Sequence, residues 1–249
     1  MKKGLLLLVA SLVSFASINS VAAEETTGDT ITNRSGVVIP IEKYNALKSI
    51  YSDNFMNYMT QEEYNIIKDK DLSKVVIKEI TDTNSNSSTG TRAQEHTTAS
   101  KSLRIVNNDG FVTMSLTWYK VPTIKKWDVM AFRKNTSVNI SNYYLFRQYY
   151  LSTDNESKLS TEKYGQNFDN GVGATFKVQN GSGHEMELSA DFTGSGRVYG
   201  SYQHASNSKA TLADAMDYTL SGSGFGGVIL FNEAIESKFD GMGGVYLTL

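Results

Sequence analysis

The chain has 249 residues, of which 40% are hydrophobic and 20% are charged, with no cysteine and a formal net charge of −2. A chain of this length can bury a substantial core, and the lack of cysteine excludes disulfide bonds and thiol chemistry. Because the balance is slightly acidic and no block of lysine and arginine appears, the composition argues against nucleic acid as a partner.

The N-terminus has the pattern of a secretory signal peptide. Two lysines precede an apolar run, and the small residues 21–23 come directly before Glu24. The apolar run is shorter than the roughly 20 apolar residues that a membrane span requires. We therefore predict a signal peptide over residues 1–23 and a secreted, extracellular chain with no transmembrane anchor after cleavage. A lysine-headed signal without later disulfides favours a bacterial source.

Residues 24–80 are predicted to form a helical N-terminal segment. Apolar side chains recur at helical spacing between Ile41 and Tyr51. Thr60, followed three residues later by Glu63, is a capping-box signature for the start of a second helix. Because short isolated helices are only marginally stable in water, we expect both helices to pack on each other and on another part of the chain.

A polar stretch, residues 81–101, separates this segment from the rest of the chain. Its only apolar residues are Ala93 and Ala99, so it cannot offset its ordering entropy by burial. We predict a flexible linker or a long exposed loop here.

The period of the apolar residues changes beyond this linker from that of a helix to that of a strand. Residues 111–119, FVTMSLTWY, alternate apolar and polar side chains, and further short runs of this kind are separated by glycine-rich turns. The fold class that we predict is mainly β, with an antiparallel β-sandwich or barrel-like domain over residues 102–249 preceded by the short helical segment.

The stretch NYYLFRQYY, residues 142–150, would be aromatic on both faces as a strand. Since arginine is rarely fully buried without a partner, we expect the face with Arg147 to be the outer one. Tyr143, Arg147 and Tyr149 are therefore our candidate ligand-binding residues. The alternative is that a second sheet or the N-terminal helices cover these rings, with Arg147 paired or reaching water.

Catalytic and metal-binding patterns are weak. Glu185 and Glu187 would share one strand face about 7 Å apart, as glycosidase carboxylates can. The opposite face of this strand is apolar, which is typical of an ordinary strand with a core side and a solvated side; its residues are Met186, Leu188, Ala190 and Phe192. His96, His184 and His204 lack metal-ligand spacing, and we expect them to be exposed at turns or strand ends. We predict no catalytic residues, no metal site and no cofactor.

Two stretches, residues 58–72 (YMTQEEYNIIKDKDL) and residues 222–249, resemble small secreted proteins of Gram-positive, especially clostridial, bacteria that have no assigned function. The resemblance implies an extracellular bacterial protein with a helical N-terminal segment and a β-rich C-terminal domain. It transfers no catalytic residue.

Three functions are consistent with these features. The first is a non-enzymatic binding protein whose exposed aromatic residues recognise a glycan or another component of the cell envelope or a host surface. The second is a membrane-active or pore-forming protein, in which the glycine- and serine-rich residues 211–231 rearrange on lipid. The third is a glycan hydrolase that uses Glu185 and Glu187. The sequence does not predict the oligomeric state.

Overall fold

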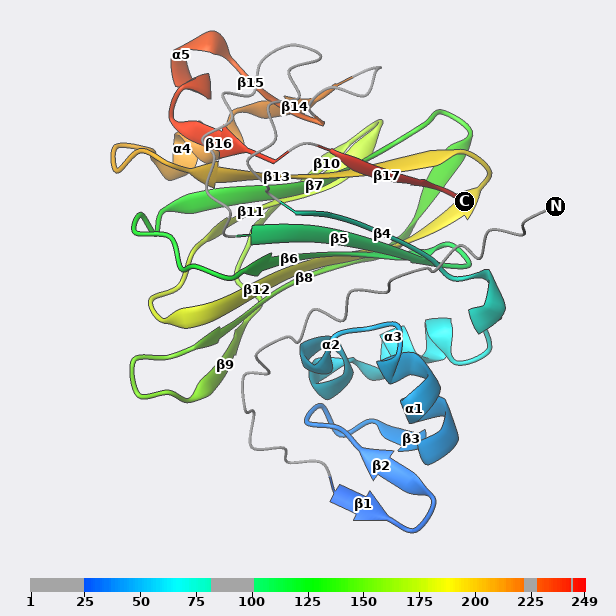
Figure 1. The fold of residues 1–249 in the computed structure, drawn as a ribbon. Helices are drawn as coiled ribbons and strands as arrows, with labels where there is room; N and C mark the ends of the chain where they lie inside the picture. Colours follow the sequence, from blue (N-terminus) through cyan, green and yellow to red (C-terminus); the bar gives the residue numbers. More distant parts are fainter. Residues whose placement is uncertain (1–24, 82–100, 222–227, 243) are drawn as a thin grey trace, which may run out of the picture.

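The computed structural model describes residues 25–81, 101–221, 228–242 and 244–249, shown in Figure 1. Most of these residues form antiparallel β-sheets, which confirms the predicted fold class in its main feature. The predicted signal peptide lies outside the described residues. So does the predicted linker, apart from its end residues Thr81 and Lys101.

Two large antiparallel sheets pack face to face in the middle of the molecule (Figure 1). The first sheet has the strand order β4-β5-β6-β12-β8-β9, and the second has the order β10-β11-β7-β13-β16, with β17 also paired to β13. The strands of the first sheet are β4 (Val76–Thr81), β5 (Lys101–Asn108), β6 (Phe111–Trp118), β8 (Val138–Leu151), β9 (Ser157–Ser160) and β12 (Ser182–Gly194). Those of the second are β7 (Trp127–Lys134), β10 (Tyr164–Phe168), β11 (Gly171–Lys177), β13 (Arg197–Ala205), β16 (Phe239–Gly241) and β17 (Val245–Thr248). Because β4 pairs with β5, the first sheet begins before residue 102, where the sequence predicted the β domain to start.

The main core lies between these two sheets. The alternation in the sequence predicted its contributors on β6 and β12, and the structure confirms them as buried. They are Val112, Met114, Leu116 and Trp118 of β6, with Met186, Leu188, Ala190 and Phe192 of β12. Phe132 and Tyr202 reach the same core from the second sheet. On each strand every second side chain points inward, and these side chains meet between the two sheets, as in other β-sandwiches.

The N-terminal segment covers the outer face of the first sheet (Figure 1). It contains a small sheet and three helices where the sequence predicted two, because the Ser52 side chain accepts a hydrogen bond from Phe55 N and starts an additional helix. The predicted capping box of Thr60 and Glu63 is confirmed. The elements are β1 (Glu25–Thr27), β2 (Thr30–Thr32), β3 (Val38–Pro40), α1 (Ile41–Lys48), α2 (Asp53–Tyr58), α3 (Gln61–Ile67) and the short 3-10 helix Leu72–Lys74.

Buried Asn33 holds this segment together. Its amide Nδ2 donates to the carbonyls of Met56 and Met59 at 3.0 and 2.9 Å, while its Oδ1 accepts from Val37 N at 2.9 Å. The loop after β2 is thereby fixed to α2. The apolar side of the segment then packs on Val106 and Phe111 of the first sheet, which supplies the partner that short helices need.

The C-terminal part of the chain covers the outer face of the second sheet, at the opposite end of the molecule (Figure 1). Its apolar residues pack on Val129 and Ala131 of β7. The elements are α4 (Leu212–Met216), β14 (Tyr218–Leu220), β15 (Ile229–Phe231) and α5 (Glu233–Glu236). Each sheet is therefore covered on both faces over much of its area. Within the described ranges, no helix is long and apolar enough to cross a membrane.

Candidate functional site

Arg147 lies where the N-terminal helices meet the first sheet. Its side chain is buried, and its guanidinium forms ion pairs with Glu63 of α3 and, at 2.8 Å, with Glu187 of β12. The register of the sheet places Glu187 directly opposite Arg147 on the neighbouring strand, so this pair is a cross-strand contact. The same guanidinium nitrogen donates to the Tyr149 hydroxyl at 3.4 Å.

This arrangement corrects the expected exposure of Tyr143, Arg147 and Tyr149. Arg147 and Tyr149 are only 1% and 2% exposed, and the Tyr143 ring packs 5.9 Å from that of Phe111 beneath the helical segment. The prediction of an exposed aromatic patch is wrong. The alternative is correct, in which the helices cover these rings and Arg147 is paired. The apolar side of the helices is buried against this face of the sheet, and Glu63 supplies the charge that pairs with Arg147.

The expectation that Glu185 and Glu187 lie on a solvated strand face is also wrong. Glu187 is 1% exposed and accepts a second hydrogen bond from Ser189 Oγ at 3.2 Å, while the Glu185 carboxylate accepts from Asn54 of α2 at 2.7 Å. Helices from the distant N-terminal segment cover this face. A glycosidase acid and base must reach a substrate, and Glu187 is closed to one in this arrangement.

Burial dominates the electrostatics of this cluster. It raises the pKa of the Glu187 carboxyl to about 8, although Arg147 favours the charged form, and it raises the pKa of Glu185 as well. One guanidinium faces the two carboxyl groups of Glu63 and Glu187 without water between them. The burial of Glu187 therefore favours its protonated form near neutral pH, against the attraction of Arg147.

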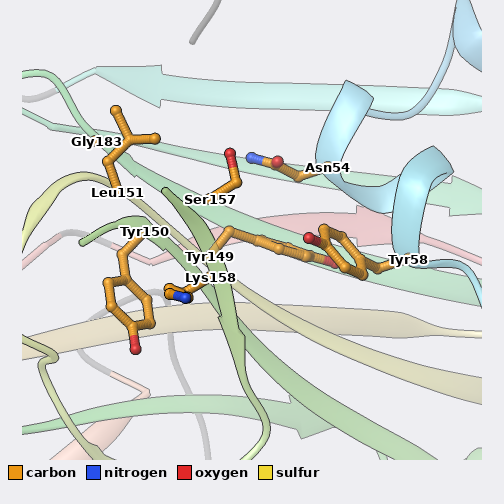
Figure 2. Close-up of a pocket in the computed structure, with 8 residues that line it drawn as sticks. All are labelled: Asn54, Tyr58, Tyr149, Tyr150, Leu151, Ser157, Lys158 and Gly183. Atoms are coloured by element: carbon orange, nitrogen blue, oxygen red, sulfur yellow. The ribbon is translucent and has the colours of Figure 1, made fainter. Parts of the chain in front are cut away.

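A small pocket opens next to this cluster, between α2 and the hairpin of β8 and β9 (Figure 2). We call it the junction pocket. The residues that line it are Asn54, Tyr58, Tyr149, Tyr150, Leu151, Ser157, Lys158 and Gly183. The rings of Tyr58 and Tyr149 lie 5.5 Å apart at 34°. The Tyr150 ring stacks on His184 at 6.0 Å and 14°.

Polar groups accompany these rings. Asn54 supplies an amide that is oriented by Glu185, and Lys158 supplies an ammonium paired with the exposed Glu156. Of the three predicted binding residues, the structure brings only Tyr149 to the pocket. Sequence reasoning missed Asn54 and Tyr58, because no local pattern signals a contact between α2 and the strands β8, β9 and β12, which come much later in the chain.

The histidines differ from their predicted positions. His184 is completely buried and His204 is 5% exposed, so the prediction of exposed histidines is wrong for both, while His96 lies outside the described residues. Both stand on strands of covered sheets. Burial lowers the pKa of His184 to about 4. In the part of the chain that the structure describes, no three histidine, aspartate or glutamate side chains gather as a metal site.

No protein-family model and no curated protein matches the sequence. Three solved structures show a distant likeness. ACE19, the collagen-binding subdomain of the Enterococcus faecalis surface protein ACE, is 9% identical with a TM-score of 0.30, covering 57% of this chain and 87% of its own. The collagen-binding domain of a Staphylococcus aureus adhesin is 9% identical with a TM-score of 0.27, covering 37% and 75%. The KRT10-binding region domain of the pneumococcal protein PsrP is 8% identical with a TM-score of 0.29, covering 52% and 86%. At such scores the likeness carries no argument, and the fold rests on the sheets described above.

Proposed function

We propose that this chain is an exported, non-enzymatic binding protein that recognises a glycan of the cell envelope or of a host surface at the junction pocket. The observation that supports the proposal is the combination of the part-exposed rings of Tyr58 and Tyr150, next to the buried Tyr149, with an amide and an ammonium around one small depression. The proposed site keeps Tyr149 from the sequence prediction. The proposed site lies at the border between the N-terminal helices and the first sheet, whereas the sequence predicted a site on the flat face of one strand.

The chemistry of the lining suits a sugar. A tyrosine ring can stack on the apolar face of a sugar, and its hydroxyl can form hydrogen bonds with sugar hydroxyl groups. Asn54 and Lys158 add donors that would fix the orientation of the ligand, as a few polar groups do in an otherwise aromatic site. Because the pocket is small, one protruding group of a sugar would enter it while the remainder lies on the surface.

The signal-peptide pattern of residues 1–23 supports export. An extracellular location gives such a protein access to envelope and host glycans. The location is part of the proposal.

The test is binding of the purified chain to three immobilised sets, namely cell-wall glycans, host glycans and liposomes. Retention on one glycan class, without binding to liposomes, supports the proposal. Binding to liposomes with leakage of a trapped dye, and to no glycan, would replace it with a membrane-active function. The absence of binding to every glycan would reject it.

A further inference from the structure

A second buried pair of charged residues lies between the two sheets, away from the junction pocket. Lys101 begins β5 of the first sheet, and Asp240 lies on β16 of the second. The two residues are 1% and 6% exposed, and the Lys101 Nζ lies 3.5 Å from the nearer Asp240 oxygen. This pair therefore joins the two sheets through side chains alone.

Aromatic groups surround the lysine. Its Nζ lies 5.0 Å from the centre of the Trp118 ring and 5.7 Å from that of Tyr202. The rings are held in place, because Trp118 Nε1 donates to the Tyr202 hydroxyl at 3.2 Å and that hydroxyl donates to Asp128. Asp128 is completely buried and also contacts Nδ1 of His204 at 3.0 Å.

Such an environment disfavours separate charges. Burying an ammonium and a carboxylate costs desolvation energy that their attraction repays only with excellent geometry. The hydrogen bond between them, at 3.5 Å, is long for a charged pair. An uncharged amide in place of the two charges would avoid this cost, and the burial of both side chains limits the access of water that would reverse a condensation.

The two groups are also within reach of each other, since Lys101 Nζ lies 3.5 Å from Asp240 Oδ2, an oxygen bonded to the carboxyl carbon that the amine would attack. Groups held roughly 3 to 3.5 Å apart in a fixed orientation react far faster than the same groups in solution. Here two strands of different sheets hold the amine and the carboxyl, and each side chain is confined by the packed core.

We propose that Lys101 and Asp240 condense to an intramolecular amide bond that cross-links the two sheets. A proton passes from the Lys101 ammonium to the Asp240 carboxylate, which leaves an amine and a carboxylic acid. The amine Nζ attacks Cγ, the Nζ–Cγ bond forms, and one Cγ–O bond breaks. The leaving hydroxyl departs as water with a proton from Nζ. The step needs neither an oxidant nor a co-reactant, and it exchanges two buried charges for a neutral amide.

The consequence is a covalent restraint in a chain without cysteine. The bond would join the first strand after the polar stretch 81–101 to a strand near the C-terminus, and so close most of the sandwich into one loop. Cross-links over long loops restrict the unfolded chain most strongly in the chain-entropy account. For an exported protein, the amide would replace disulfides with a bond that reducing conditions do not break.

The test is a peptide map of the purified full chain by mass spectrometry. The expected result is a branched peptide that contains both Lys101 and Asp240, with a mass one water below the sum of the two linear peptides. Trypsin should also fail to cleave after Lys101. The proposal is overturned if linear peptides account for all of both residues.

Asp240 precedes Gly241, and an Asp-Gly sequence can itself lose one water by forming a cyclic imide. The branched peptide separates the two products, since an imide leaves the Lys101 peptide linear. The variant Lys101→Arg keeps a positive charge but lacks the amine, so its Asp240 peptide should retain the full mass. Loss of water from that peptide in the variant would assign the change to the imide and contradict the proposal.

Lys238 and Asp214 provide the matched control within the same map. Their atoms are closer, at 2.9 Å, but their side chains are 26% and 15% exposed. Water can reach this pair, so its peptides should remain linear. Cross-linking at this pair as well would show that distance alone decides and would contradict the role of burial. The map of the unaltered chain decides the main question even if Lys101→Arg folds poorly.

Discussion

Arg147 of β8 and Glu63 of α3 form an ion pair with side chains 2% and 0% exposed, which joins the N-terminal helices to the first sheet. Glu63 also accepts a hydrogen bond from Thr60 N at 2.8 Å and completes the capping box of α3. Because Arg147 contacts Glu187 of β12 too, one guanidinium joins three elements. The helical segment is therefore attached to the sheet by charge as well as by apolar contact.

Replacing Arg147 should destabilise the protein strongly. In Arg147→Met, Glu63 and Glu187 keep their buried carboxyl groups but lose their cation, and loss of one partner from a buried pair costs about 3 to 5 kcal/mol. The free energy of unfolding in urea measures this change. Lys48→Met is the control, since its partner Asp53 is 59% exposed and such pairs contribute about 1 kcal/mol or less. Equal effects of both substitutions would contradict the assigned role of Arg147.

Glu187 should make stability depend on pH. Its carboxyl has a pKa raised by burial to about 8, so the folded state keeps a proton that the unfolded chain releases near its ordinary value of 4.5. The folded state thus binds more protons between these values, and stability falls as the pH rises from about 4.5 to about 8. Each pKa unit corresponds to roughly 1.4 kcal/mol.

The variant Glu187→Gln tests this directly, because glutamine has a similar shape and does not titrate. Its free energy of unfolding should decline less than that of the unaltered chain across the same pH window. The difference between the two curves removes contributions that both proteins share, such as those of Glu185 and His184. Parallel curves would show that Glu187 is charged at neutral pH in the folded state.

His184 should remain neutral well below its ordinary pKa. Burial lowers that pKa to about 4 from 6.5, so the stability that this residue contributes is present above pH 6.5 and is lost as the pH falls through about 4. Nuclear magnetic resonance of the imidazole protons, assigned with His184→Gln, measures the midpoint. A midpoint near 6.5 would mean that the ring is accessible to water.

The sequence predicted the inward faces of β6 and β12 because period two requires neighbouring side chains to point to opposite sides. It also predicted the capping box, since Thr60 and Glu63 are close in the chain. The polar face of β12 was misassigned for a physical reason. Alternation shows that the two faces differ in chemistry, but it does not show what covers the polar one, and Glu187 is satisfied by Arg147 from another strand.

The junction pocket illustrates the same limit. Tyr149 could be selected because of its aromatic neighbours in the strand, whereas Asn54 and Tyr58 belong to a helix whose position depends on packing. Asn54 contacts Glu185 at a sequence separation of 131 residues, and short-range patterns carry no signal of such a contact. Local propensity and periodicity define the individual helices and strands. Long-range contacts between charged and polar side chains help to decide which surfaces of these helices and strands pack together.

The most direct measurement is a calorimetric titration of the chain and two tyrosine variants with the glycan that the binding panel selects. Tyr150→Ala removes a ring from the junction pocket, while Tyr164→Ala removes a 38% exposed ring on β10 outside it. Circular dichroism first checks that both variants are folded. We then expect Tyr150→Ala to bind at least tenfold more weakly, a loss of about 1.4 kcal/mol of binding free energy, and Tyr164→Ala to bind as the unaltered chain does. Equal affinity of Tyr150→Ala and the unaltered chain would contradict recognition at the junction pocket.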